Sequence, residues 1–170
     1  MFLTMAVLAI PLMLITWFFQ SAGSDEPVVP EVDWQSAVAD AKASKAFDVR
    51  EPAALPAGWR ATKARWMEPG QPGTNGDPVP GHTLELGFLS DDQMHFALNQ
   101  TLSPSGPYVT RVSREGYENG TVEVNGTTWK HYISPDERTH SLVLLDGKVT
   151  RMVVSDAGVE RLKEFAGLLK

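Results

Sequence analysis

The sequence has no cysteine among its 170 residues. This absence excludes disulfide bonds, a zinc site built from thiolates, a lipid-modified cysteine and a cysteine nucleophile. Packing alone must therefore hold the fold together. The absence of cysteine is compatible with either an oxidising or a reducing compartment.

Charge is missing from the first 24 residues, which contain no Asp, Glu, Lys or Arg. The net charge of -6 therefore belongs to the chain from Asp25 onward. An acidic domain is a poor partner for a phosphate backbone, so we expect no nucleic-acid partner.

Motifs for catalysis are missing as well. The sequence has no G-x-S-x-G nucleophile elbow, no phosphate-binding loop and no dinucleotide-binding glycine pattern. The acidic pairs Asp91-Asp92 and Asp136-Glu137 lie in predicted turns, where solvated carboxylates are ordinary. We therefore predict no catalytic residues, no cofactor and no enzymatic activity, with a hydrolase as the distant alternative.

One long apolar run, MFLTMAVLAIPLMLITWFF, occupies residues 1–19. As a helix rising about 1.5 Å per residue, it would reach roughly 28 Å, the thickness of a bilayer core. Aromatic residues 17–19 end the run, and such rings favour the membrane interface. We predict a single-pass transmembrane anchor in the cell membrane, with the C-terminal domain extracytoplasmic.

Two alternatives to an uncleaved anchor stay open. The small residues of 20–24, QSAGS, would suit a signal peptidase, although the apolar run is longer than the usual signal-peptide core. A buried N-terminal helix is disfavoured because every face would be apolar. No Lys or Arg precedes the run, unlike the usual pattern of exported proteins, so we expect the natural start to lie upstream.

Beyond the anchor, residues 20–32 combine acidic residues with prolines and are predicted to be a solvated stalk. Residues 33–170 are predicted to form a single extracytoplasmic α+β domain. It should open with a helix over 33–46, in which Asp33 accepts hydrogen bonds from the first turn. A second amphipathic helix should close the chain over 156–170.

A strand is predicted from Trp59 to Met67, and its two tryptophans, Trp59 and Trp66, should face opposite sides because they are seven positions apart. Residues 69–81 follow, with eight of thirteen positions Gly or Pro. This composition predicts a flexible or polyproline-like loop with no core to hold it.

An antiparallel sheet is predicted for the rest of the chain. The strand segments are 82–90, 93–103, 121–124, 127–133, 139–145 and 148–155, with a short helix near 105–115. Turn residues separate the last four strands, and the apolar runs within the last two predict burial on both faces. If the helices over 33–46 and 156–170 at least partly cover the two faces of the sheet, the fold class is a mostly antiparallel α+β sandwich.

Three triplets match the acceptor pattern for N-linked sugar, at Asn99, Asn119 and Asn125. The pairs Asn119-Gly120 and Asn125-Gly126 also have the composition of tight turns, and they bracket a four-residue strand. We interpret both pairs as turns rather than as sugar sites.

Histidine suggests one candidate metal site. If the hairpin turns at Pro135-Asp136 with a two-residue loop, His131 pairs directly with His140, close enough to share zinc or copper. The other interpretation is a pair of neutral imidazoles on the strand surface. Two ligands without a nearby carboxylate make an incomplete site, so we favour the plain pair and predict no metal.

Aromatic residues are the remaining candidates for a binding surface. Trp66, Tyr108 and Tyr132 are candidates for stacking against a ligand or glycan. Trp59 and Trp129 are instead expected in the core.

The segments PAALPAGWRATKARW and NGTTWKHY, together with the apolar N-terminus and the terminal hairpin and helix, resemble an actinobacterial family of single-pass extracytoplasmic proteins of unknown function. The resemblance covers most of the chain, and its most specific part is the Leu-Pro-x-Gly-Trp run over 55–59. It implies an outward-facing globular domain on a membrane anchor, with no catalytic residues to carry over. The chain differs in lacking the basic residues that usually precede the anchor.

These observations lead us to expect a non-enzymatic interaction module of the cell envelope, whose partner is an envelope protein or a glycan. The alternative is a secreted or tethered module that binds a small ligand or metal through the sheet face and the Gly/Pro loop. A concave pocket with convergent polar groups would favour a ligand, whereas a flat exposed apolar patch would favour a protein partner.

Overall fold

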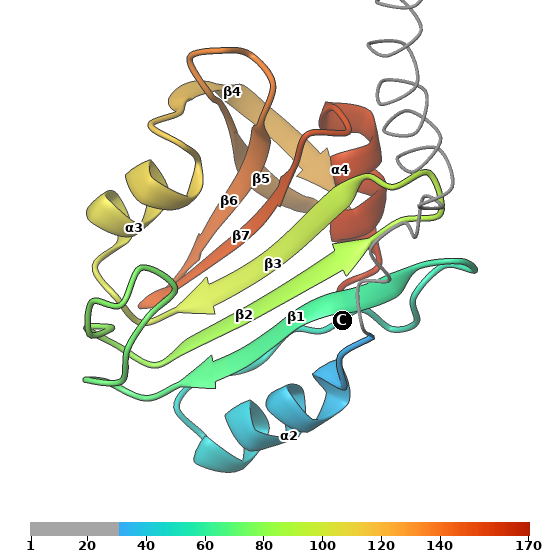
Figure 1. Ribbon diagram of the computed structural model, residues 1–170. Helices are drawn as coiled ribbons and strands as arrows, with labels where there is room; N and C mark the ends of the chain where they lie inside the picture. Colours follow the sequence, from blue (N-terminus) through green and yellow to red (C-terminus); the bar gives the residue numbers. More distant parts are fainter. Residues whose placement is uncertain (1–30) are drawn as a thin grey trace, which may run out of the picture. The chain divides into compact units, whose positions relative to one another are not determined.

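The computed structural model describes residues 31–170, which form a seven-stranded antiparallel sheet and three helices (Figure 1). The predicted α+β class is confirmed for this part of the chain. The predicted anchor, residues 1–19, and most of the predicted stalk lie outside the described residues. Within 31–170, no helix has both the length and the apolar character needed to cross a membrane.

The sheet consists of two meanders joined through a helix. Its strands are β1 (Arg60–Met67), β2 (Thr83–Leu89), β3 (His95–Thr101), β4 (Tyr117–Val124), β5 (Thr127–Ile133), β6 (His140–Asp146) and β7 (Val149–Ser155). The helices are α2 (Trp34–Ser44), α3 (Ser105–Val112) and α4 (Val159–Gly167). The strand order is β1-β2-β3-β7-β6-β5-β4, so β3 pairs with β7, the last strand of the second meander.

Helix α2 begins where its capping residue predicts. The Asp33 carboxylate accepts hydrogen bonds from the backbone N–H groups of Gln35 and Ser36, which satisfies two donors that a helix start leaves free. The helix ends at Lys45, whose φ of 55° is left-handed. The face that carries Ala41 is buried against the sheet.

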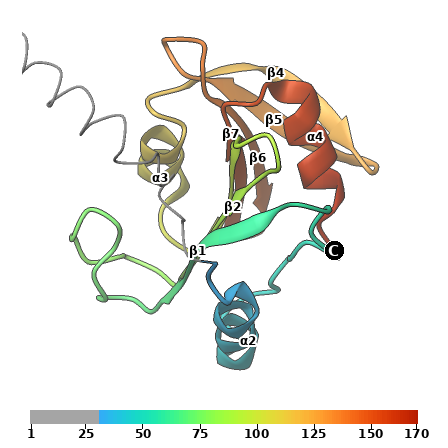
Figure 2. The same cartoon turned by 45° about the vertical axis from the view of Figure 1, so that its right-hand side comes forward.

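The helices cover the sheet differently from the prediction. Helices α2 and α4 pack on the same face, over the larger apolar core that includes Phe88 and Trp129. The short helix α3 covers the other face, where Val109 packs against Met152 and Val143 (Figure 2). The order of helices along the chain therefore did not reveal which face each one covers.

A β-bulge at Thr62 overturns the prediction that Trp59 and Trp66 face opposite sides. The pairing of β1 with β2 shifts register at this residue, which inserts one extra position between the tryptophans. Trp59 stacks on Phe165 of α4 at 5.7 Å, and Trp66 packs against Phe47 at 5.8 Å. Both indoles therefore pack against the larger core, because the extra residue at the bulge puts Trp59 and Trp66 on the same face of the sheet.

The two Asn-Gly pairs have different structures. Asn125 and Gly126 both have positive φ, 49° and 74°, and form the predicted hairpin turn between β4 and β5. Asn119 and Gly120 instead lie at a bulge inside β4, which begins at Tyr117, so the predicted turn at that pair is wrong. A bulge uses the positive φ of glycine just as a turn does, which explains the error.

The central strand β7 is buried along nearly its whole length, as its apolar run predicts. The run in β6 behaves differently at its end, where Leu145 is 54% exposed. Leu145 lies at the end of β6, next to the Asp146-Gly147 turn.

Candidate functional site

The Gly/Pro segment 69–81 is a loop held by hydrogen bonds, which corrects the prediction of a flexible or polyproline-like loop with no core to hold it. The backbone N–H of Gly70 donates to the carbonyl of Val79 at 2.9 Å, and that of Gly73 donates to the carbonyl of Asp77 at 2.7 Å. The loop therefore folds back on itself through its own backbone, a property that composition does not reveal.

A buried carboxylate fastens this loop to the sheet. Glu85 of β2 is 5% exposed, and its Oε2 atom accepts a hydrogen bond of 2.7 Å from the Thr74 hydroxyl. The Lys63 ammonium lies 2.6 Å from the same oxygen. Arg65 adds a second attachment by donating to the carbonyl of Pro72 at 2.8 Å.

Two opposing effects set the pKa of Glu85. Burial alone would raise this pKa, but the hydrogen bonds from Lys63 and Thr74 and the charges of Lys63 and Arg65 lower it below the ordinary 4.5. The carboxylate is therefore charged at neutral pH and keeps both of its partners.

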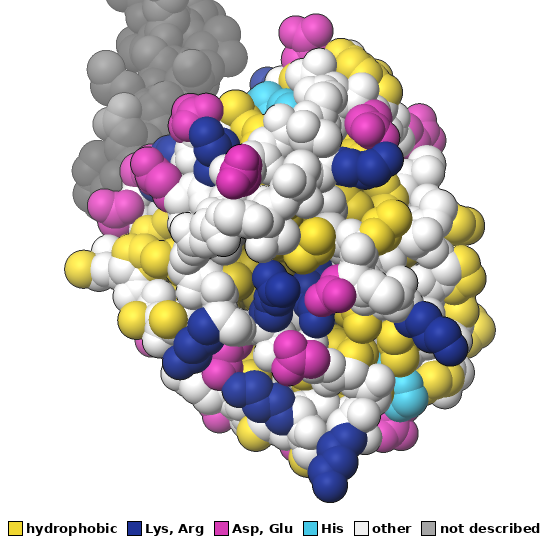
Figure 3. All heavy atoms as spheres, turned by 180° about the vertical axis from the view of Figure 1, so that it is seen from behind, with side chains coloured by type: hydrophobic (Ala, Val, Ile, Leu, Met, Phe, Trp, Pro, Cys, Tyr) yellow, Lys and Arg dark blue, Asp and Glu magenta, His cyan; other side chains and the backbone are white. Residues whose placement is uncertain are grey.

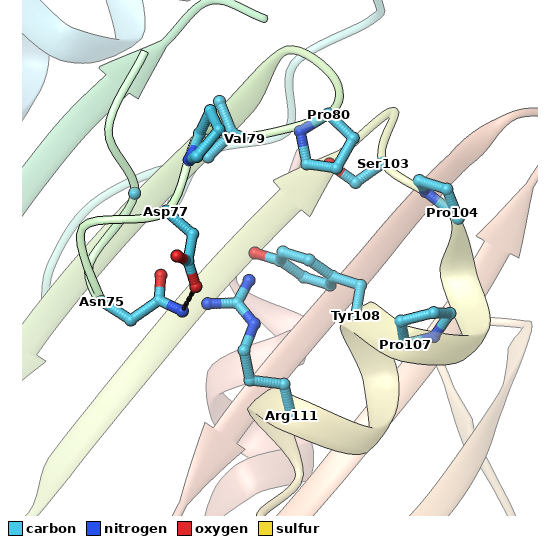
Figure 4. A pocket seen from close by; sticks show the side chains of 11 residues that line it. Asn75, Asp77, Val79, Pro80, Ser103, Pro104, Pro107, Tyr108 and Arg111 are labelled. Atoms are coloured by element: carbon cyan, nitrogen blue, oxygen red, sulfur yellow. Dashed lines mark hydrogen bonds between the residues drawn. The ribbon is translucent and has the colours of Figure 1, made fainter. Parts of the chain in front are cut away.

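Between this loop and helix α3 lies a cavity of about 320 Å³ (Figure 4). Four prolines form most of its apolar wall, two from the loop and two at the start of the helix: Pro78, Pro80, Pro104 and Pro107. The polar groups come from both sides, Asn75 and Asp77 from the loop and Tyr108 and Arg111 from the helix. Segments about 30 positions apart in the sequence therefore converge on one small volume.

Tyr108 has an unsatisfied polar group at this cavity. The side chain is 4% exposed, and its hydroxyl has no hydrogen-bond partner among residues 31–170. Figure 4 shows the ring extending from α3 toward the loop, with the hydroxyl at its inner end. Burial, followed by the nearby charge of Glu85, raises the pKa of Tyr108 well above its usual 10, so the phenol stays protonated and can donate a hydrogen bond.

Two side chains of opposite charge face the same cavity. The Arg111 guanidinium lies 5.0 Å from the centre of the Tyr108 ring and makes no ion pair within the described chain. The Asp77 carboxylate accepts a hydrogen bond of 2.6 Å from the Asn75 amide and likewise makes no ion pair there. Figure 4 shows Arg111 directed toward the Asn75–Asp77 pair.

His131 and His140 do lie together, but not in the predicted register. His131 is opposite Leu142, and His140 is opposite Ile133, because the hairpin has a four-residue loop over 135–138 instead of a two-residue loop. Diagonal neighbours on a twisted sheet are still within reach of aromatic rings. The two imidazoles stack at 5.2 Å, with Nε2 of His131 3.0 Å from Nδ1 of His140.

This histidine pair has the features of a structural contact. Burial, followed by the charge of His140, lowers the pKa of His131 below 6.5. The facing nitrogens share a hydrogen bond, and so one nitrogen of each ring is already occupied. Nowhere in residues 31–170 do three or more His, Asp or Glu side chains gather in a metal-binding arrangement.

The three aromatic candidates, Trp66, Tyr108 and Tyr132, lie apart. Trp66 is on the α2 side, where its ring stacks on His82 at 5.5 Å. Tyr132 packs on the α3 face, and its hydroxyl donates to Glu118 at 3.4 Å. Only Tyr108 combines burial, an unpaired hydroxyl and a place on the wall of the cavity.

The acidic pairs occupy turns, as predicted. Asp92 accepts hydrogen bonds from Ser90 and Arg161, and Asp136 accepts one of 2.5 Å from Ser134. Their oxygens are therefore engaged in fixing local structure. Acidic and basic side chains are interspersed over the face seen in Figure 3.

Sequence reasoning missed Asp77, Glu85 and Arg111. A signal for Arg111 was present, because it lies three positions after Tyr108 and therefore on the same side of the predicted helix. Nothing in the sequence placed Asp77 opposite that helix, since the loop reaches it only through the tertiary fold.

A family model described as a protein of unknown function (DUF4245) matches residues 1–169. The match covers nearly the whole chain, including the apolar N-terminal run. No curated protein matches the sequence.

Proposed function

We propose that this chain, which belongs to the DUF4245 family of proteins of unknown function, is a non-enzymatic module that binds a small ligand in the cavity between the Gly/Pro loop and α3. The unpaired hydroxyl of Tyr108 is the observation that carries this proposal. A few convergent polar groups on a mostly apolar wall are the usual composition of a ligand site.

Energetics support a ligand at this position. A buried polar group without a partner costs about 1–3 kcal/mol, and an incoming hydrogen-bond acceptor would recover that cost. The loop wall is already held by Thr74 and Glu85, so binding would not have to order it. The cavity is thus incomplete in its hydrogen bonding, and because the Tyr108 hydroxyl is shielded from solvent, a small shift of the loop or of Arg111 must accompany binding.

The exposed apolar surface favours a small ligand over a flat docking partner. Within the described chain, the large apolar side chains that are strongly exposed are Tyr117, at 51%, and Leu145, at 54%. They lie on different strands, β4 and β6, and two separate side chains do not make a docking patch. An envelope protein or a glycan is therefore the second candidate.

We further propose that residues 1–19 tether this module to the membrane, with the folded domain on the extracytoplasmic side. The support is the apolar run, in which Thr4 and Thr16 are the only polar residues, its aromatic end and the acidic residues after it.

Ligand-observed NMR with a fragment library tests the proposed function, using the full chain in detergent micelles. We expect fragments to bind the wild type and to lose affinity on Tyr108→Phe, which removes only the hydroxyl. The matched control is Tyr117→Phe, since Tyr117 is exposed on β4 and is not among the residues that line the cavity. Hits that respond equally to both substitutions, or no hits at all, would contradict the proposed function.

Fractionation of cells that carry a C-terminally tagged chain tests the tether. We expect the tag in the membrane fraction, and we expect protease added to intact cells, or to protoplasts where a wall blocks access, to remove it. A tag in the culture medium would instead indicate a cleaved signal peptide. A membrane-bound but protected tag would reverse the proposed orientation.

A further inference from the structure

We propose that the ligand of this cavity is a small zwitterion, of the class of an α-amino acid with an apolar side chain. This inference rests on the proposed function and adds a chemical class to it. Its basis is the pair of opposite charges, Arg111 and Asp77, that face one cavity without an ion pair to any described residue.

Arg111 provides the site for the ligand carboxylate. Its guanidinium lies 5.0 Å from the centre of the Tyr108 ring, so an aromatic face supports the cation while its N–H groups stay free. A planar guanidinium binds a carboxylate through two parallel hydrogen bonds. The Tyr108 hydroxyl, which lacks a partner, supplies one more donor at the inner end of the cavity.

Asp77 provides the site for the ligand ammonium. One carboxylate oxygen, Oδ2, accepts from the Asn75 amide at 2.6 Å, which orients the group. The backbone contact from Gly73 to the Asp77 carbonyl, 2.7 Å long, fixes the same stretch of loop. Oδ1 makes no hydrogen bond with any residue in 31–170 and can accept from an ammonium.

The presence of both Arg111 and Asp77 disfavours ligands that carry charge of only one sign. A phosphate or dicarboxylate would match Arg111 but place excess negative charge beside Asp77, and a plain amine would place a cation beside Arg111. Arg111 and Asp77 are both exposed, so solvent screens part of this repulsion, but like charges brought together still weaken binding. A molecule with one charge of each sign satisfies both groups at once.

The volume of the cavity and the residues of its wall indicate the uncharged part of the ligand. The cavity of about 320 Å³ is near the lower limit for small-molecule sites, which suits a ligand of a few atoms beyond its charged groups. Four proline rings and Val79 line it, so the side chain of the ligand should be apolar.

The test measures binding to the full chain in detergent micelles by isothermal titration calorimetry, with three matched probes. L-leucine carries both charges, 4-methylpentanoate lacks the ammonium, and 3-methylbutylamine lacks the carboxylate. We expect leucine to bind at least tenfold more tightly than either analogue.

Substitutions of Arg111 and Asp77 then show which residue binds the carboxylate of leucine and which binds its ammonium group. Arg111→Gln should weaken leucine at least tenfold and leave 3-methylbutylamine no weaker than before. Asp77→Asn should weaken leucine similarly while leaving 4-methylpentanoate no weaker. The matched controls, Arg114→Gln and Asp91→Asn, change exposed residues outside the cavity lining and should leave leucine binding unchanged.

The outcomes separate this inference from the proposed function. Fragments that bind in a Tyr108-dependent way, together with no preference for leucine over its analogues, would overturn the zwitterion and leave the proposed function standing. The absence of any Tyr108-dependent binding would overturn both. Leucine binding that Arg111→Gln and Asp77→Asn leave unchanged would also overturn the inference, since neither charge would then contact the ligand.

Discussion

Thr74 and Glu85 are joined by a hydrogen bond of 2.7 Å that links the Gly/Pro loop to β2, the strand next to the edge of the sheet. The contact connects a loop residue to a carboxylate that is 5% exposed, and the same loop forms one wall of the cavity. The shape of the proposed binding site therefore depends on a residue that does not line it.

Thr74→Val should loosen the loop without changing the cavity lining. The substitution removes the hydroxyl and keeps the side-chain shape, so we expect a loss of about 1 kcal/mol in the free energy of unfolding. Amide hydrogen exchange at Gly73 and Val79 should speed up, because their N–H groups hold the loop together. Thr74→Ser keeps the hydroxyl and serves as the control. Equal exchange rates in the two variants would show that the contact does not hold the loop.

Glu85 should make stability depend on pH in the acidic range. Its pKa in the folded protein is lowered below 4.5, so its stabilisation is complete above pH 4.5 and is lost as the pH falls through the folded pKa. At pH 7, Glu85→Gln should lower the free energy of unfolding by about 1–3 kcal/mol. Urea denaturation should show this difference shrinking as the pH falls below 4.5. A constant difference would show that the pKa is not lowered.

Gly81 should tolerate no side chain. A Cβ atom at this position would lie 2.7 Å from backbone atoms of Leu102 and Ser103, which cannot move aside easily. Gly81→Ala should therefore cost about 1–3 kcal/mol of stability and weaken fragment binding, because Pro80 and Ser103 line the cavity. Gly167→Ala in α4 meets no atom closer than 3.8 Å beyond its chain neighbours and its own helix backbone, and should raise stability by up to about 1 kcal/mol. Thermal denaturation of both variants measures their melting temperatures, and equal values would contradict this prediction.

His131 should titrate below pH 6.5. Its burial and the charge of His140 disfavour the imidazolium, so the folded protein should lose stability as the pH falls from 6.5 through the folded pKa. An NMR titration of the His131 ring measures this pKa directly. His140→Phe keeps an aromatic neighbour and removes its charge, which should move the pKa of His131 part of the way back toward 6.5. An unchanged pKa of His131 in this variant would show that burial alone lowers that pKa.

Phe165 should be among the costliest positions to truncate. It is 1% exposed and lies within 6 Å of the rings of Trp59, Phe88 and Phe96, at 5.7, 5.7 and 5.4 Å. Phe165→Ala should lower the free energy of unfolding by about 3–5 kcal/mol, as measured by urea denaturation. Leu145→Ala, at an exposed site, should change it by at most about 0.5 kcal/mol. Similar losses for the two variants would mean that α4 is not part of the core.

Local chemistry made much of the secondary structure predictable. Asp33 determined where α2 begins, and Asn125-Gly126 determined the hairpin between β4 and β5. The apolar stripe of the final helix and the alternation within the strands indicated an antiparallel α+β fold. These signals act over a few residues, so the sequence displays them directly.

The candidate site was predictable only in part. Tyr108 was recognisable as an aromatic on a short helix, and Arg111 follows it by one turn. Asp77 was not recognisable, because its loop is ordered by Glu85 and Lys63, residues of β2 and β1 whose approach depends on the sheet. The histidine pair was found despite a wrong register, since diagonal contacts tolerate such a slip.

The sequence by itself determined most of the helices and strands, the net negative charge and the apolar run at residues 1–19. Only the tertiary structure decided that β3 pairs with β7, that α2 and α4 share one face, and that the bulge at Thr62 turns both tryptophans inward. It also brought Asp77 and Arg111 to one cavity. The physical reason is how far apart along the chain the interacting residues are. Helix propensity and turn chemistry act between neighbouring residues. The strand order, the face of the sheet that each helix covers and the position of the cavity instead follow from the burial of surfaces that are distant along the chain.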